Sequence, residues 1–178
     1  MADKLGDKTA RLAGRLTLNP VKHIDPIGFI MLFIAKFGWA KPVPINPYNI
    51  RGDIKQGLLL ISLAGPAMNL ILAVTSAIIL GIAGFPAHPL GQEFLFYMIL
   101  INVVLAVFNL IPIPPLDGSK ILAGILPGRQ EWLLHMEQYG IIILILLVFT
   151  GAIGRIFDFF VLPIADFLIH LSYSLARI

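Results

Sequence analysis

Long apolar runs separated by short polar stretches dominate the chain. Residues 57–84 carry no charged side chain, and the runs at 94–111, 132–154 and 156–175 are also strongly apolar. A helix needs about 20 largely apolar residues to cross a bilayer. The pattern therefore predicts an all-α integral membrane protein, a multi-pass helical bundle that forms one membrane-embedded domain over residues 1–178.

The N-terminal part of the chain departs from this pattern. Residues 1–26 are polar and basic, which is typical of a cytoplasmic segment. The apolar run from Ile27 to Trp39 is too short for a straight crossing. Prolines at positions 42, 44 and 47 then exclude a regular helix. Residues 27–47 are therefore expected to form a re-entrant or hairpin segment at the membrane, irregular and partly sheet-like.

Composition supports the membrane class and narrows the chemistry. Of the 178 residues, 58% are hydrophobic and 13% are charged, whereas a soluble domain averages about 45–50% and about 25%. Cysteine is absent, which excludes disulfides and cysteine-based metal sites. The net charge of +3 is small, and in a membrane protein it bears on topology, so no nucleic-acid partner is expected.

The distribution of Lys and Arg predicts which side of the membrane each loop faces. Basic residues are concentrated before residue 57 and recur at Lys120 and Arg129, whereas residues 85–93 contain none. Basic loops favour the cytoplasmic side. Residues 40–56 and 112–131 are therefore expected in the cytoplasm of a protein in the cell membrane. Asp117 belongs on the same side, and the sequence leaves the oligomeric state open.

The run at 57–84 contains a row of small or polar residues at every fourth position. This row would let a neighbouring helix approach closely, and it consists of Gly65, Asn69, Ala73, Ala77 and Gly81. Asn69 follows Pro66, which removes one backbone hydrogen bond from the helix. Asn69 either makes a structural hydrogen bond or takes part in chemistry, and the pattern leaves both open.

The run at 94–111 ends in a second polar feature, the stretch NLIPIPPLDG. Asn102 and Asn109 lie on one helical face and are expected to point inward. The prolines that follow break the helix, and broken backbone at membrane depth persists only where it lines protein or a wet cavity. Asp117 then starts a short helix. It is either an N-cap or a functional carboxylate, two roles that do not exclude each other.

Four segments together resemble the site-2 protease family of intramembrane zinc metalloproteases, in its compact prokaryotic form. They are GRLTLNPVKHIDPIGFIML, WAKPVPINPYNIR, LAGPAMNLILA and NLIPIPPLDGSKIL. The resemblance implies a zinc cofactor, a transmembrane protein or peptide as substrate within the lipid bilayer, Asp117 as a zinc ligand and Asn109 as the amide that steadies the oxyanion. It also matches Asn69 to the asparagine of the family's GPxxN helix. Structural or groove-forming roles are expected for Pro66, Asn69, Asn102, Pro112, Pro114, Pro115 and Gly118.

One part of the family pattern is missing from residues 1–178. The four histidines occur as HIDPI at 23, HPLGQ at 88, HMEQY at 135 and HLSYS at 170, and none reads H-E-x-x-H. In the family that motif lies just upstream of a segment like residues 2–20. The chain is therefore expected to be truncated, with Met1 immediately after the missing motif. A catalytic zinc needs three protein ligands and a nearby base. We therefore expect this chain to bind zinc weakly or not at all and to be inactive as written.

Two other functions compete with a protease. A pseudoprotease would bind transmembrane helices without cleaving them. A proton-coupled transporter would use Asp158, Asp166 and His170 of the last apolar run. A possible ligand pair at His23 and Asp25 is better explained by a polar loop entering the membrane surface.

Overall fold

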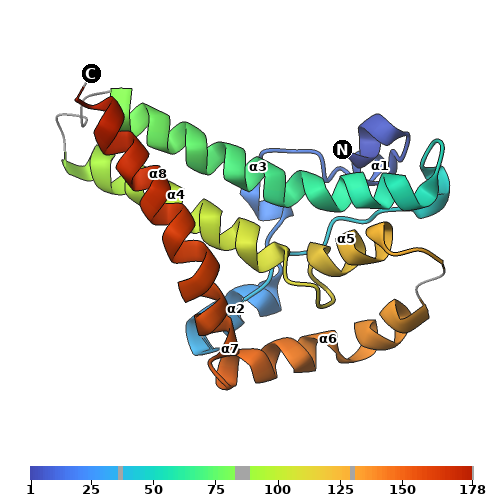
Figure 1. The fold of residues 1–178 in the computed structure, drawn as a ribbon. Coiled ribbons are helices and arrows are strands. Elements are labelled where there is room, and N and C mark those ends of the chain that lie inside the picture. The colour runs from blue at the N-terminus through green and yellow to red at the C-terminus, as the bar shows by residue number, and fades with distance from the viewer. Residues whose placement is uncertain (36–37, 83–88, 129–130, 178) are drawn as a thin grey trace. The chain divides into compact units, whose positions relative to one another are not determined.

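The structure is a computed structural model that describes residues 1–35, 38–82, 89–128 and 131–177, without the side chains of residues 35 and 131–135. Helices dominate this part of the chain, and the β-pairing within it is one antiparallel bridge between Ile24 and Ala40. Figure 1 shows the helices in chain order. The predicted all-α fold is confirmed.

The chain divides into two compact units, residues 1–58 and 59–178, with the boundary inside α3. The N-terminal unit holds short helices joined by extended segments. They are η1 (Ala2–Leu5), α1 (Thr9–Leu12), η2 (Pro20–Lys22), α2 (Pro26–Ala35), η3 (Pro47–Asn49) and the first turn of α3 (Ile54–Ile82).

A buried carboxylate organises the polar part of the N-terminal unit. Asp7 is 0% exposed. Its carboxylate accepts hydrogen bonds from the backbone N–H and the hydroxyl of Thr9. It also accepts from the backbone N–H of Asn46 at 2.9 Å and from Asn49 Nδ2 at 3.3 Å. The Arg51 amide also donates to Leu5 O at 2.8 Å. These bonds join the first ten residues to the segment that precedes α3.

The segment predicted to be irregular is partly helical. α2 occupies Pro26–Ala35, with proline at its first position and its Gly28 amide bonded to Asp25 Oδ1 at 2.9 Å. Proline suits the first turn of a helix, and an aspartate before it caps the free amides. Residues 38–46 form no helix; Ala40 pairs with Ile24 in the antiparallel bridge, and Lys41 N donates to His23 O at 2.8 Å. Residues 36 and 37 of the predicted segment lie outside the described residues.

The C-terminal unit contains the long helices. They are the rest of α3, α4 (Pro89–Asn109), α5 (Asp117–Ile125), α6 (Glu131–Phe149), α7 (Ala152–Ile156), the π-helical turn η4 (Phe157–Val161) and α8 (Leu162–Leu175). Within the described residues, α3 and α4 are long and apolar enough to cross a membrane. The part of α6 from Met136 forms with Ala152–Leu175 a third candidate, bent by 79°. The chain turns at Thr150 and Gly151, before the predicted boundary at 155, and residues 83–84 of the first predicted span lie outside the described range.

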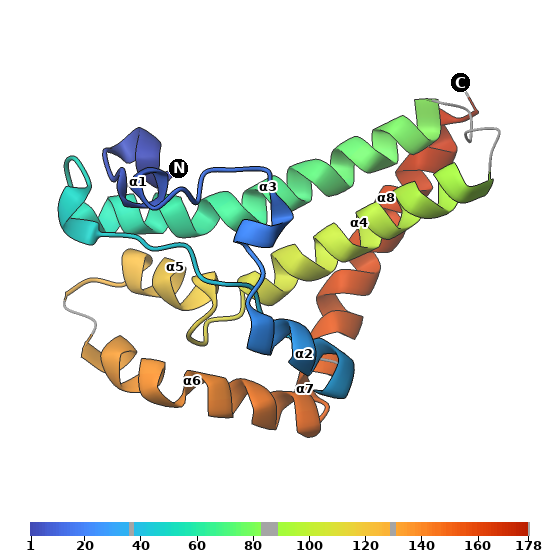
Figure 2. The same cartoon turned by 180° about the vertical axis from the view of Figure 1, so that it is seen from behind.

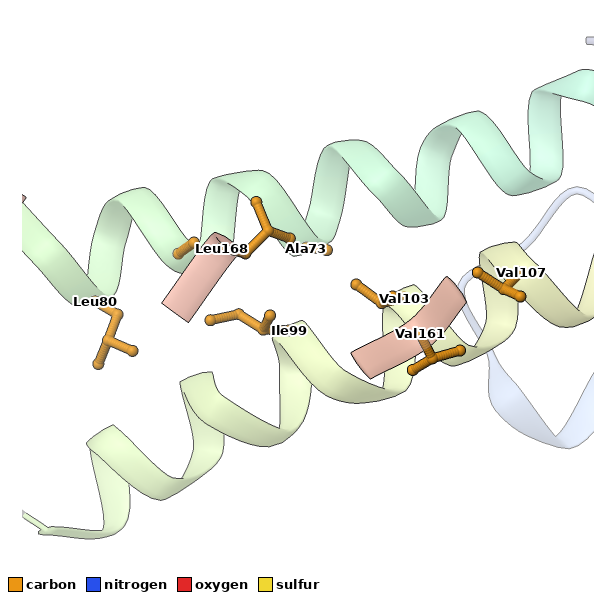
Figure 3. Close-up of a cluster of buried hydrophobic side chains, with 8 residues drawn as sticks. Ala73, Leu80, Ile99, Val103, Val107, Val161 and Leu168 are labelled. Atoms are coloured by element: carbon orange, nitrogen blue, oxygen red, sulfur yellow. The ribbon is translucent and has the colours of Figure 1, made fainter. Parts of the chain in front are cut away.

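The core of this unit lies where α3, α4 and α8 meet (Figure 3). Its buried side chains are Ala73, Ala77, Leu80, Ile99, Val103, Val107, Val161 and Leu168. Both views of the ribbon show α8 crossing alongside α4 (Figures 1 and 2). A second cluster under the broken end of α4 is formed by Ile111, Leu116, Leu144 and Ile153.

The row of small residues on α3 forms a contact surface, as predicted, and it packs against more than one neighbouring helix. Ala73 and Ala77 are fully buried in the core with α4. Gly81 packs on α8, where a Cβ would lie 2.7 Å from Ser172 O. At Gly65 a Cβ would lie 3.4 Å from Asp117 Oδ2. The same row therefore faces α5, α4 and α8 in turn.

Candidate functional site

The candidate site begins where α4 stops. Asn109 is the last residue of α4, and the seven positions from Leu110 to Leu116 form turns before α5 starts at Asp117. Three prolines in this stretch cannot donate backbone hydrogen bonds. The remaining amides close tight turns instead, with Ile113 N on Ile111 O at 2.8 Å and Leu116 N on Ile113 O at 3.0 Å. The predicted break is confirmed, and we name residues 110–116 the broken segment.

Two glycines allow α5 and α6 to approach the backbone around the broken segment closely. A Cβ at Gly118 would collide with the carbonyl oxygens of Leu110 and Ile111, so only glycine lets α5 start this close to the end of α4. A Cβ at Gly140 would collide with the carbonyl of Pro114, so α6 also lies against the segment. Pro114 is fully buried there, whereas Pro112 and Pro115 are exposed. Sequence reasoning missed Gly140, because a glycine within an apolar helix does not by itself indicate a close packing contact.

Asp117 turns toward α3 and is not the N-cap of α5. The N-cap is Leu116, which makes no capping bond with its side chain, and Asp117 is the first helical residue. Its carboxylate accepts a hydrogen bond from the hydroxyl of Ser62, a buried residue of α3, and it lies next to Gly65. Gly65 of α3 therefore leaves space for the carboxylate, and Ser62 supplies one hydrogen-bond donor. Ser62 was not predicted, because a lone serine in an apolar helix usually bonds to its own backbone.

Burial dominates the electrostatics of Asp117. It raises the pKa of the Asp117 carboxyl above its ordinary value, because the charged form loses solvation. The Lys120 ammonium, one turn along α5, and the Ser62 hydrogen bond both oppose this rise. A carboxylate held half-buried beside a cation has the properties expected of a metal ligand or an acid–base group.

The three predicted amides differ in their surroundings. Asn102 is 6% exposed, and its Nδ2 donates to Met98 O within its own helix at 2.8 Å, which fits a structural role. Asn109 is half-exposed and donates in the same way to Leu105 O at 2.8 Å. Asn69 is half-buried, one turn from Gly65 and one from Ala73. Asn69 and Asn109 thus both lie at the margin of the packed core.

The described residues do not fit a catalytic zinc. A zinc of that kind takes three protein ligands and keeps one open position. Within the described ranges, no group of three or more His, Asp or Glu side chains could hold a metal. The His23 ring bonds to Thr17 O at 2.9 Å, and His170 is exposed on α8. His88 and the side chain of His135 lie outside the described residues.

Comparison with known proteins identifies a family model and several relatives that match this chain. The model of Peptidase family M50 matches residues 87–152, which include Asn109 and Asp117. "Putative zinc metalloprotease YwhC" of Bacillus subtilis strain 168 is 41% identical over 158 residues, which cover 84% of this chain and 72% of that protein. "Putative zinc metalloprotease Rip2" of Mycolicibacterium smegmatis is 34% identical over 161 residues, covering 86% and 61%. A zinc metalloprotease of Methanocaldococcus jannaschii is 35% identical over 79 residues, covering 44% and 23%. No solved structure matches the chain.

The fold and the site define a class, a multi-helix membrane protein with a carboxylate placed by a proline-broken helix end. Among such proteins, the extent and identity of the match to the Bacillus relative decide the family. The chain belongs to peptidase family M50, the site-2 protease family, whose relatives are named as zinc metalloproteases.

Proposed function

We propose that this chain supplies the carboxylate and the amide of a site-2-protease-like metalloendopeptidase that cleaves transmembrane segments. The observation that carries the proposal is the position of Asp117, held against α3 by Ser62 and Gly65 directly after the broken segment. Asn109 lies at the other end of that segment. Membership of peptidase family M50 supports the proposed roles of Asp117 as a metal ligand and Asn109 as a hydrogen-bond donor to the substrate.

The chemistry of Asn109 is that of a hydrogen-bond donor to the substrate. Its amide nitrogen carries two hydrogens, and one of them bonds to Leu105 O. The second can donate to the carbonyl oxygen of a peptide bond that lies along the broken segment. Such a donor stabilises the negative charge that develops on that oxygen during hydrolysis.

The broken segment suits an unwound transmembrane substrate. A peptide bond inside an α-helix is shielded by its own hydrogen bonds, so a membrane helix must open before it can be cleaved. Pro112 and Pro115 are exposed, and Leu110 is 43% exposed. This surface offers apolar contacts to side chains of an extended segment.

The proposed metal site needs ligands besides Asp117, and no group of three suitable side chains lies within the described ranges. Asp117 provides one oxygen ligand, and zinc would polarise the scissile carbonyl and activate water when bound. In the proposed mechanism two further ligands and a base would come from an H-E-x-x-H motif, which residues 1–178 do not contain. The basic loops argue that Asp117 faces the cytoplasm, so cleavage would occur near that side of the cell membrane.

The experiment that tests this function is a cleavage assay on the chain extended at its N-terminus by an H-E-x-x-H helix. We expect Asn109→Ala to lower the turnover of a transmembrane substrate in liposomes by about 10²–10³-fold, because one oxyanion donor is lost. Zinc content should stay unchanged. Asp117→Ala should abolish both turnover and zinc binding.

Asn102→Ala is the matched control, since Asn102 donates to its own helix in the same way and is buried. It should leave turnover near that of the unmodified chain and cost about 1 kcal/mol of stability. Full activity of Asn109→Ala would remove this amide from the mechanism. An extended chain that binds zinc and the substrate but never cleaves would favour the pseudoprotease.

A further inference from the structure

Two polar side chains of α8 face away from the core of the C-terminal unit. The inward face of this helical stretch is formed by the buried residues Val161, Ala165, Leu168 and Ser172. Asp166 and His170 are both exposed. With 3.6 residues per turn, they lie on roughly the opposite side of the helix from that inward face. Asp166 and His170 are four residues apart and therefore share one face.

The depth of these residues follows from the contacts of the inward face. Leu168 lies in one cluster with Ile99, which is ten residues from each end of the candidate membrane span α4. At the end of α8, Ser172 and Leu175 contact Gly81, next to the last residue of α3. Asp166 is nine residues before Leu175, or about 13 Å along the helix axis. Asp166 therefore lies well inside the apolar depth of the bundle.

The surface around this pair is one that lipid would otherwise cover. Leu162 is 50% exposed, Phe167 is 66% exposed and Phe159 is 73% exposed. A carboxylate and an imidazole on such a surface are costly when they face acyl chains, and in membrane proteins such groups pair with a partner. A polar neighbour for Asp166 and His170 would remove this cost.

We propose that this neighbour is α8 of a second copy of this chain. The face carries one acceptor, the Asp166 carboxylate, and one donor, the His170 imidazole, so it is complementary to itself. Two copies inserted in the same orientation are related by a two-fold axis along the membrane normal, and each contact then occurs twice. Asp166 of one copy bonds to His170 of the other, one turn away, and the apolar residues around the pair close over both contacts.

The test is self-association of the whole chain in liposomes, measured by energy transfer between donor-labelled and acceptor-labelled copies. Asp166→His and His170→Asp should each weaken association by about tenfold to a hundredfold, because two interhelical hydrogen bonds are lost. A mixture of the two variants should associate as the unmodified chain does. In that mixture one copy carries two imidazoles and the other carries two carboxylates, so both contacts form again.

The mixture separates an interface from a role inside one copy, because a defect within a copy cannot be repaired by a different copy. The chain has no cysteine, so Ser174→Cys on the exposed side of α8 should form a disulfide-linked dimer, whereas the buried Ser172→Cys should not. Circular dichroism should show unchanged helix content in every variant. A monomeric unmodified chain, unaffected association of the single variants, or no recovery in the mixture would each overturn the proposal.

Discussion

Asp7 shows how one short side chain can order a segment that has little apolar core. It bonds to Thr9, two residues ahead, and to Asn46 and Asn49, about 40 residues away. The hydroxyl of Thr9 contributes most to lowering the pKa of the Asp7 carboxyl, to about 2, and the other hydrogen bonds add to it against the effect of burial. The folded N-terminal unit therefore favours the ionised carboxylate.

This shift predicts a dependence of stability on pH. The pKa of Asp7 in the folded chain is about 2, below about 3.9 in an unfolded chain. A lowered folded pKa stabilises the fold above the unfolded pKa, and the stabilisation is lost as pH falls through the folded value. Between about pH 4 and pH 2 the N-terminal unit should thus lose stability. The fluorescence of Trp39 in a Trp132→Phe background reports its unfolding.

Asp7→Asn should be less stable than the unmodified chain at pH 7 and should have a flatter profile between about pH 4 and pH 2. Identical profiles for the two chains would show that Asp7 does not have this role.

At the scale of single residues, sequence reasoning selected candidate residues that motifs mark and missed contacts that only the tertiary structure reveals. Asp117 was identified because a carboxylate after three prolines is unusual in an apolar chain. Its contact with Ser62 could not be predicted, because it depends on how α5 lies against α3. Asp7 carried a local signal, an aspartate two residues before a threonine, but its bonds to Asn46 and Asn49 are set by the tertiary fold.

At the scale of elements, α6 packs directly against the broken segment that follows α4. Gly140 lies directly on the carbonyl of Pro114. Gly140→Ala forces these backbones apart, and overpacking of this kind costs about 1–3 kcal/mol. Thermal unfolding in detergent should show the loss.

Gly154→Ala in α7 is the matched control, because apart from its chain neighbours and its own helix backbone nothing lies within 4 Å of the added Cβ. It should be neutral or stabilising by up to about 1 kcal/mol, since alanine favours helix over glycine. Equal unfolding temperatures for the two variants would contradict the close packing at Gly140.

The bounds of elements were predictable where prolines or charges mark them and less so elsewhere. Prolines correctly indicated that a break follows α4, which ends at Asn109, and that residues 38–46 form no regular helix. The end of α6 at Phe149 depends on Gly151, which adopts a φ of 74° and lets the chain bend by 79° between α6 and α7. A Thr-Gly pair inside a long apolar run signals such a turn only weakly. The helical form of Pro26–Ala35 was also not predicted, because ten apolar residues fit several structures.

At the scale of the whole molecule, the placement of basic residues makes a prediction about topology that the fold alone does not. In a chain without cysteine, single cysteines report sidedness directly. In intact cells, Glu93→Cys should react with an impermeant thiol reagent applied from outside. Pro127→Cys, in the loop after α5, should react only after the membrane is permeabilised. Both positions are exposed, so the reverse labelling pattern would place Asp117 on the outer side.

We propose that Asp117 is one ligand of a zinc site that the described residues do not complete, and zinc content tests this central proposal most directly. The purified chain should hold less than about 0.1 zinc per molecule, and the same chain extended by an H-E-x-x-H helix should hold about one, as a three-ligand site requires. Asp117→Asn in the extended chain should lower that value strongly, whereas Asn109→Ala should not. One tightly bound zinc in the unextended chain, or an extended chain whose zinc is unaffected by Asp117→Asn, would contradict the account.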